Sequence, residues 1–270
     1  MSTRARSLGA RRLLRLSALG LVLLATATAV APLRADEGAP ARPNDSRESA
    51  AQLLDGFVRY TLRDYARARE ILQPLAQQGN ADAQQLLAGM HANGEGAPQD
   101  SARAAHWFSR AAEQGKADAQ FALGIMYRDG AGVPQDRALA LSWLRRAAEQ
   151  QHSDAANSLG ELYVESGSAA DRREAAAWFE RAALMGHGTA QYNLGVLFAR
   201  GHGVRQSKLQ AYKWLELSAG STVGAQRDIA WRELVAMRER MMPSQVEAAD
   251  LLVRDWVSRV RWARWGRWAN

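Results

Sequence analysis

Cysteine is absent from all 270 residues of the chain. Its absence excludes a disulfide framework, zinc or iron–sulfur ligation by cysteine, and thiol catalysis. Proline is also sparse, with 7 residues, and glycine is ordinary, with 22, so the chain is neither collagen-like nor of low complexity. The remaining composition, 47% hydrophobic and 23% charged, suits one or two soluble domains with a sizeable core.

Acidic residues are missing from one end of the chain and nearly missing from the other. Residues 1–35 contain six arginines and no acid, and residues 254–270 contain five arginines and only Asp255. Residues 36–253 hold 24 basic and 27 acidic residues, so the formal net charge of +7 comes from the two ends. With a net charge of −3, residues 36–253 have no excess of basic residues that could bind a phosphate backbone. We therefore expect no nucleic-acid partner.

The N-terminal residues have the order of a secretory signal. A basic segment precedes an uncharged run, Leu16–Ala31, and small residues follow it. The run is 16 residues long, short of the ~20 that a membrane-spanning helix needs. We predict a signal peptide over residues 1–35, cleaved after Ala35 or Ala29, with an uncleaved inner-membrane anchor as the alternative. Residues 36–50 are polar, contain two prolines and are predicted to form a disordered linker.

A repeat of about 36 residues organises the rest of the chain. Trp107, Trp143, Trp178 and Trp214 follow one another at intervals of 36, 35 and 36 residues. An Ala-Gln pair, Ala-Ala in the third copy, recurs at the same period, and so does an aromatic position occupied by Tyr127, Tyr163 and Phe198 but by His91 in the first copy. Self-similarity at a fixed period of this length is the signature of a solenoid.

Each repeat is predicted to form two helices. The first starts near Asp82, Asp118, Asp154 or Thr189, whose side chains can accept hydrogen bonds from free N–H groups of a first turn. Gly-x-Gly turns end it, because glycine tolerates a positive φ. The second helix starts at Pro-Gln-Asp in two copies and carries the tryptophan and an alanine pair. One such helix pair cannot bury its own apolar face, so the units must stack.

The run ADAQFALGIMYRDGAGVPQDRALALSWLRRAAEQ (117–150) closely resembles the Sel-one-like repeat (SLR), a branch of the tetratricopeptide-like solenoids. The resemblance implies an all-α, right-handed solenoid of stacked antiparallel helix pairs. We expect a capping helix pair over 51–80, capping helices over 224–257 with a restart near Pro243, and a Trp/Arg-rich tail over 258–270. The four units expected between the caps span 81–116, 117–152, 153–187 and 188–223.

Residues with catalytic or metal-binding patterns are lacking. None of the five histidines forms H-E-x-x-H, and neither G-x-S-x-G nor a phosphate-binding glycine loop occurs. We predict no catalytic residues, no metal and no cofactor. A few members of the resembling family are described with hydrolase-like or antibiotic-binding activity. A hydrolase on cell-wall or β-lactam substrates is therefore kept as a further alternative, although no residue pattern here supports it.

An interaction surface is expected along the first helices, which line a concave groove in related solenoids. Positions spaced i, i+4 and i+7 share one face of a helix and differ between the units. These variable positions predict the partner-binding residues Phe121, Ile125, Arg128, Asn157, Glu161, Tyr192 and Val196. Exposed Phe121, Ile125 and Tyr192 would anchor a peptide. The alternative is that they pack against the next unit.

The tail combines tryptophan with arginine. Trp262, Arg264, Trp265, Arg267 and Trp268 suit a membrane interface or an anionic glycan. The alternative is a frayed end whose first tryptophan, Trp256, docks on the cap.

The sequence as a whole predicts a non-catalytic adaptor or scaffold that binds a protein or peptide in the solenoid groove. Since the resemblance implies a bacterial protein, the signal places it in the periplasm, in an envelope-related process. Attachment to a membrane surface or an anionic glycan through the tail is the alternative function.

Overall fold

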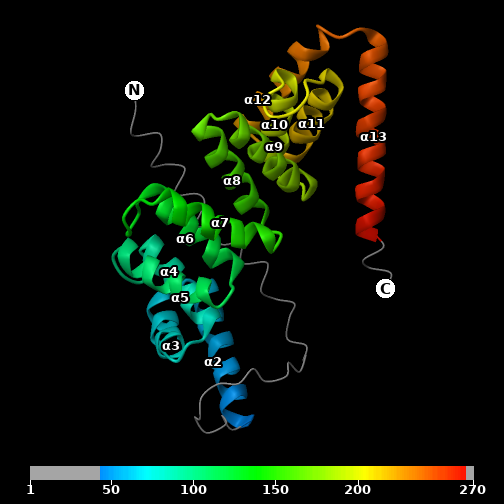
Figure 1. The fold of residues 1–270 in the computed structure, drawn as a ribbon. Coiled ribbons are helices and arrows are strands. Elements are labelled where there is room, and N and C mark those ends of the chain that lie inside the picture. The colour runs from blue at the N-terminus through cyan, green and yellow to red at the C-terminus, as the bar shows by residue number, and fades with distance from the viewer. Residues whose placement is uncertain (1–42, 266–270) are drawn as a thin grey trace. The chain divides into compact units, whose positions relative to one another are not determined.

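The structure, a computed structural model, describes the backbone of residues 43–265 and the side chains of residues 47–259. All regular elements in this part of the chain are α-helices, and the all-α solenoid predicted from the sequence is confirmed (Figure 1). The described residues form two compact units that divide between Ala140 and Leu141, inside one helix.

The first unit contains five helices and the start of a sixth. They are α2 (Pro43–Thr61), α3 (Tyr65–Gln77), α4 (Ala81–Asn93), α5 (Ser101–Glu113), α6 (Ala117–Asp129) and the beginning of α7 (Arg137–Glu149). Helices α2 and α3 pack together and α3 packs on α4, around a core of leucine, alanine and methionine side chains that includes Leu72 and Leu87. The expected cap over 51–80 is thus a helix pair that covers the first repeat.

The second unit contains the end of α7 and six further helices. They are α8 (Ser153–Ser166), α9 (Ala169–Leu184), α10 (Gly188–Arg200), α11 (Lys208–Ser221), α12 (Ala225–Arg238) and α13 (Pro243–Trp265). Helices α8 and α9 pair, as do α10 and α11; α12 and α13 pack on α11. A second core joins Tyr212 and Leu215 of α11 to Leu234 of α12 and Ala249 of α13.

The expected linker is shorter than residues 36–50. Helix α2 begins at Pro43, so residues 43–50 are helical and that part of the prediction is wrong. Proline fits the first turn of a helix, where its missing N–H has no acceptor to lose. Leu53 and Phe57 of α2 pack on the first core and stabilise the helix. At the other end, the backbone of α13 stays helical into the tail, as far as Trp265.

Helix starts agree with the sequence only for the second helices. Asp100 and Asp136 cap α5 and α7, each accepting a hydrogen bond of 2.9 Å from a backbone N–H three residues on. The first helices start one or two residues earlier than expected, and Asn80, His152 and His187 provide the caps of α4, α8 and α10. Asp82, Asp118 and Asp154 lie instead within the first turn, where their charge favours the helix dipole.

In three of the units, a buried glutamine connects the unit to the one before it. Its side-chain N–H donates to a backbone carbonyl near the end of the preceding second helix, as a further donor to a carbonyl that also accepts a backbone N–H. The three bonds run from Gln84 to Ala76 (2.9 Å), from Gln120 to Ala112 (3.0 Å) and from Gln191 to Ala183 (3.2 Å). The third unit has Ala156 at this position and cannot form the bond.

The second glycine of each Gly-x-Gly turn lies directly against an earlier helix. A Cβ at Gly132 would lie 2.2 Å from the carbonyl oxygen of Ser101, and one at Gly203 would lie 2.1 Å from that of Arg172. At Gly96 the same atom would lie 2.9 Å from the Cβ of Tyr65. These glycines are therefore required by close packing as well as by their positive φ.

Candidate functional site

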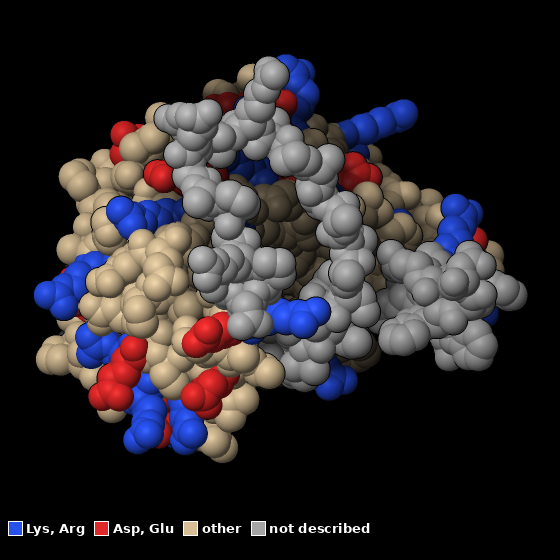
Figure 2. All heavy atoms as spheres, turned by 90° about the horizontal axis from the view of Figure 1, so that it is seen from below, with Lys and Arg blue, Asp and Glu red and all other residues tan. Residues whose placement is uncertain are grey.

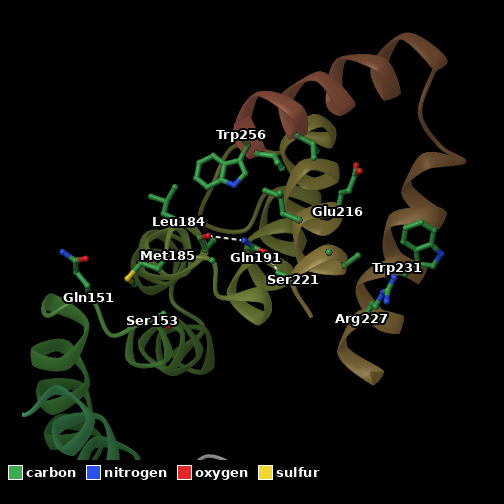
Figure 3. Close-up of a pocket in the computed structure, with 17 residues that line it drawn as sticks. Gln151, Ser153, Leu184, Met185, Gln191, Glu216, Ser221, Arg227, Trp231 and Trp256 are labelled. Carbon is green, nitrogen blue, oxygen red and sulfur yellow. Dashed lines mark hydrogen bonds between the residues drawn. The ribbon is translucent and has the colours of Figure 1, made fainter. Parts of the chain in front are cut away.

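An open groove in the second unit is the candidate site. It has a volume of about 950 Å³ and lies where the ends of α9 and α11 meet α12 and α13 (Figure 3). Cavities of this size hold ligands the size of a short peptide segment. We call it the α11–α13 groove, and its lining includes Leu184, Met185, Glu216, Leu217, Ser221, Arg227, Trp231, Val253, Trp256 and Val257.

Large apolar side chains on the wall of the groove face solvent. Leu184 is 51% exposed, Trp231 56% and Val257 40%. Leu184 comes from the end of α9, Trp231 from α12 and Val257 from α13, so three helices contribute to one apolar lining (Figure 3). Single exposed apolar side chains are common, but several around one concave site indicate a surface that another molecule covers.

Helix α13 is held at the groove by an aromatic contact. The rings of Trp256 and Trp214 meet edge to face with their centroids 5.3 Å apart. The Lys213 ammonium lies 4.2 Å from the Trp214 centroid and 4.6 Å from that of Trp256, a cation–π contact with both rings. Partial burial lowers the pKa of Lys213. The sequence analysis considered that Trp256 docks on the cap, but its ring partner, Trp214, lies on α11 in the fourth repeat unit.

Glu216 is the acidic group of the groove. Its Oε2 atom is buried without a hydrogen-bond partner among the described residues, and Figure 3 shows the side chain on α11 between Trp256 and Trp231. Desolvation, followed by the nearby Asp250 carboxylate, raises the pKa of Glu216. A hydrogen bond with Tyr212 and the charges of two arginines oppose this rise. The groove therefore places a partly desolvated carboxylate oxygen among apolar walls.

Phe121 and Ile125 are not exposed anchors. They are only 8% and 9% exposed, so that part of the prediction is wrong. Residues 83–92 of α4 and 119–126 of α6 are buried without interruption. Both stretches are packed on all sides, which leaves no free stripe. Arg128 is half-buried and pairs with Asp129, with 2.8 Å between its Nε and Oδ1.

Two of the other predicted residues meet in a polar row. The Asn157 Nδ2 donates to the Glu161 Oε1 at 2.8 Å, and the Asn157 Oδ1 accepts from the Asn193 Nδ2, one repeat later, at 3.4 Å. Tyr192 and Val196 are half-buried, and Tyr192 packs on the core that α11, α12 and α13 share. Terminal helices therefore cover part of the stripe expected to be open.

The predicted membrane or glycan residues of the tail, Trp262, Arg264, Trp265, Arg267 and Trp268, lie outside the residues whose side chains are described. The predicted signal over 1–35 also lies outside the described part.

The residues of the groove were missed, although comparison between units contains their signal. Leu184 stands where two other units have Glu113 and Glu149, and Leu217 stands where three others have arginine. Arg227 and Trp231 occupy, in α12, the stripe positions that Tyr192 and Val196 occupy in α10. Two signals therefore mark this site in the sequence. The variable stripe continues into α12, and apolar residues stand at positions where the other units have charged residues.

Neither a metal site nor a membrane-spanning helix is found among the described residues. Figure 2 shows Lys and Arg interspersed with Asp and Glu on one face, so the described residues form no extended basic patch there. Within residues 43–265, no group of three His, Asp or Glu side chains could bind a metal ion. No helix in the same range has the length and apolar character to cross a bilayer.

Comparison with known proteins agrees with this fold. The family model described as "Sel1 repeat" matches residues 51–80, 81–116, 117–152, 153–187 and 188–220. It thus includes the segment expected as an N-terminal cap. No curated protein matches the chain.

Solved structures of Sel1 repeat proteins are similar to the chain. One from Oxalobacter formigenes is 34% identical, with a TM-score of 0.58, over 63% of this chain and 68% of its own. The protective antigen c5321 of uropathogenic Escherichia coli, which has an SLR fold, is 23% identical, with a TM-score of 0.42, over 83% of this chain and 65% of its own. A putative Sel1 repeat protein from Klebsiella pneumoniae is 24% identical, with a TM-score of 0.43, over 72% and 95%.

Proposed function

The chain belongs to the Sel1 repeat family, and we propose that it is a non-catalytic adaptor that binds an apolar segment of a protein partner in the α11–α13 groove. Sel1 repeat proteins generally mediate protein–protein interaction, and the family is typically a non-catalytic scaffold. The proposal adds a location on the molecule to that general role.

The observation that carries the proposal is the group of exposed apolar side chains around the groove. Leu184, Trp231 and Val257 lie on three different helices and line one hollow. Because each side chain is held by a packed helix, a ligand has little protein to order when it binds. Tryptophan is frequent among the hot-spot residues that supply most of the binding energy of such contacts.

We also propose that the protein is exported and acts in the periplasm, in an envelope-related process. Support comes from the order of residues 1–35, in which a basic segment, an uncharged run and small residues follow one another. Fractionation of cells that carry a tagged chain tests this. Release with the periplasmic contents supports export with cleavage, and recovery with the inner membrane supports an uncleaved anchor. Recovery in the cytoplasm contradicts both.

A photo-crosslinking amino acid placed at position 231 tests the groove in living cells. We expect it to yield a discrete adduct with a protein partner, because Trp231 lies in the groove and is 56% exposed. Position 251 provides the matched control, because Leu251 is similarly exposed on α13 but lies outside the lining.

A second variant, Leu184→Glu, places a charge on the groove wall, and we expect it to abolish the adduct at position 231. Circular dichroism establishes that the variant is folded. Equal adducts at positions 231 and 251, or an adduct that persists in Leu184→Glu, would contradict the groove as the binding site.

A further inference from the structure

The α11–α13 groove has a specific chemical requirement. Its walls are apolar and exposed at Leu184 and Trp231, and Glu216 offers a buried carboxylate oxygen without a donor. A buried acceptor without a donor is costly, and a cationic donor satisfies it best because a charge-assisted hydrogen bond is stronger than a neutral one. The matching ligand is therefore a segment that combines large apolar side chains with a cation.

This chain contains such a segment in its own tail. Residues 258–270 read SRVRWARWGRWAN, with three tryptophans, four arginines and no acid. Tryptophan suits the apolar walls, and the planar guanidinium of arginine donates to a carboxylate with fixed geometry. The groove and the tail are complementary in charge and in apolar character.

The tail of the same chain is not the occupant. Val257 lies in the groove lining, and the backbone stays helical for eight residues beyond it, to Trp265. A helix rises 1.5 Å per residue, so this stretch carries the tail about 12 Å along the axis. The backbone of residues 258–265 is held in this helix, so the stretch cannot turn back on the groove unless the helix breaks.

We propose that the groove of one copy receives the Trp/Arg tail, residues 258–270, of a second copy, with a tail arginine at Glu216. This inference rests on the proposed function, because it uses the same groove. The tail and the partner compete for one site, so tail binding would regulate partner binding. Each tail starts beside its own groove, so two copies can exchange tails about a two-fold axis. The contact is then the same on both sides and closes as a dimer.

Sedimentation of the full chain over a range of concentrations tests the proposal. We expect a reversible dimer that dissociates when a synthetic peptide of residues 258–270 is added in excess. Glu216→Gln removes the charge, and we expect it to raise the dimer dissociation constant about tenfold or more. Glu239→Gln is the matched control, because Glu239 is an exposed acid of the same unit outside the groove.

The tail is tested separately with the triple variant Trp262→Ala, Trp265→Ala and Trp268→Ala. We expect this variant alone to be monomeric. Mixed with Glu216→Gln, it contributes an intact groove while the other chain contributes an intact tail. We therefore expect the mixture to associate more strongly than either variant alone.

Three results would overturn the proposal. The first is a full chain that stays monomeric at high concentration, including one that instead co-sediments with vesicles of anionic lipid through the tail. The second is a dimer indifferent to both Glu216→Gln and the tail variant. The third is a dimer that the peptide does not dissociate.

The two proposals are distinguished by the mass of the adduct at position 231, because Trp231 lines the groove that would receive either occupant. An adduct with a different protein supports the adaptor role even if the full chain is monomeric. A dimer whose only adduct at position 231 is a crosslinked pair of this chain supports the tail exchange and contradicts the adaptor role.

Discussion

The substitution Gly132→Ala tests how closely the repeat units pack. Gly132 has a φ of +76°, and a Cβ there would lie 2.2 Å from the carbonyl oxygen of Ser101. Since real Cβ atoms essentially never approach within 3.0 Å of such an atom, the turn must move away from α5 by nearly 1 Å. The three nearest atoms all belong to the backbone of Ser101 and Ala102, so a side-chain movement cannot relieve the overlap.

Gly115→Ala is the matched control. Gly115 also has a positive φ, +88°, but a Cβ there meets nothing within 4 Å. The left-handed conformation costs an L-residue about 1–2 kcal/mol at either position. Overlap in a packed region adds about 1–3 kcal/mol at position 132 alone. We therefore expect Gly132→Ala to lower the free energy of unfolding by about 1–3 kcal/mol more than Gly115→Ala does.

Urea unfolding followed by circular dichroism measures the difference. The chain forms two compact units, so a single transition is not assumed, and hydrogen exchange of α5 and α6 supplies a local readout. We expect faster exchange at the start of α5 in Gly132→Ala and unchanged exchange there in Gly115→Ala. Equal destabilisation by the two substitutions would refute the close-approach argument and leave only the φ requirement.

Three further outcomes follow from the contacts. Gln84→Leu removes one of the donors to the Ala76 carbonyl of α3 and the acceptor of the Gln114 amide. We expect a loss of about 0.5–1.5 kcal/mol per hydrogen bond in urea unfolding, with the exposed Arg103→Gln as the control. Burial and neighbouring arginines lower the pKa of His91, so the unfolded chain binds the proton more readily than the folded chain. We therefore expect the melting temperature to fall as the pH drops below about 6.5. In melts between pH 5 and 7, His91→Tyr should reduce this pH dependence, whereas the exposed His106→Gln should leave it in place. Trp256→Ala removes the ring that contacts Trp214, and we expect hydrogen exchange in α13 to become faster while exchange in α4 stays unchanged. An equal change in α13 and α4, relative to the unsubstituted chain, would contradict docking through this residue.

The repeat could be predicted from the sequence because every stacked unit needs the same residue types at the same positions. Alanine, leucine and tryptophan recur wherever helices approach one another, and the period alone gave the helix pairs. The chemistry of the Ala-Gln motif was not readable, because the acceptor of Gln84 is the carbonyl of Ala76, in the preceding unit. The second role of Gly132 was hidden for the same reason, since its neighbour Ser101 is distant in sequence.

The binding stripe was predicted in the wrong place for a physical reason. Variation between units marks positions that stacking does not fix, but Phe121 and Ile125 vary and are nevertheless buried. Seven of the eight residues over 119–126 in their helix are apolar, and that run should have outweighed the stripe. Exposure depends on what packs over a helix, and the helices that cover Tyr192, α12 and α13, lie beyond the matched repeats.

The α12 stripe shows that the groove belongs to the end of the array. Arg227 and Trp231 are exposed at positions whose counterparts Phe121 and Ile125 are buried in an interior unit. One further repeat of different sequence after α12 would therefore bury Arg227 and Trp231 and expose other side chains one unit further along. Repeat number would then set binding specificity, as well as the reach of the scaffold.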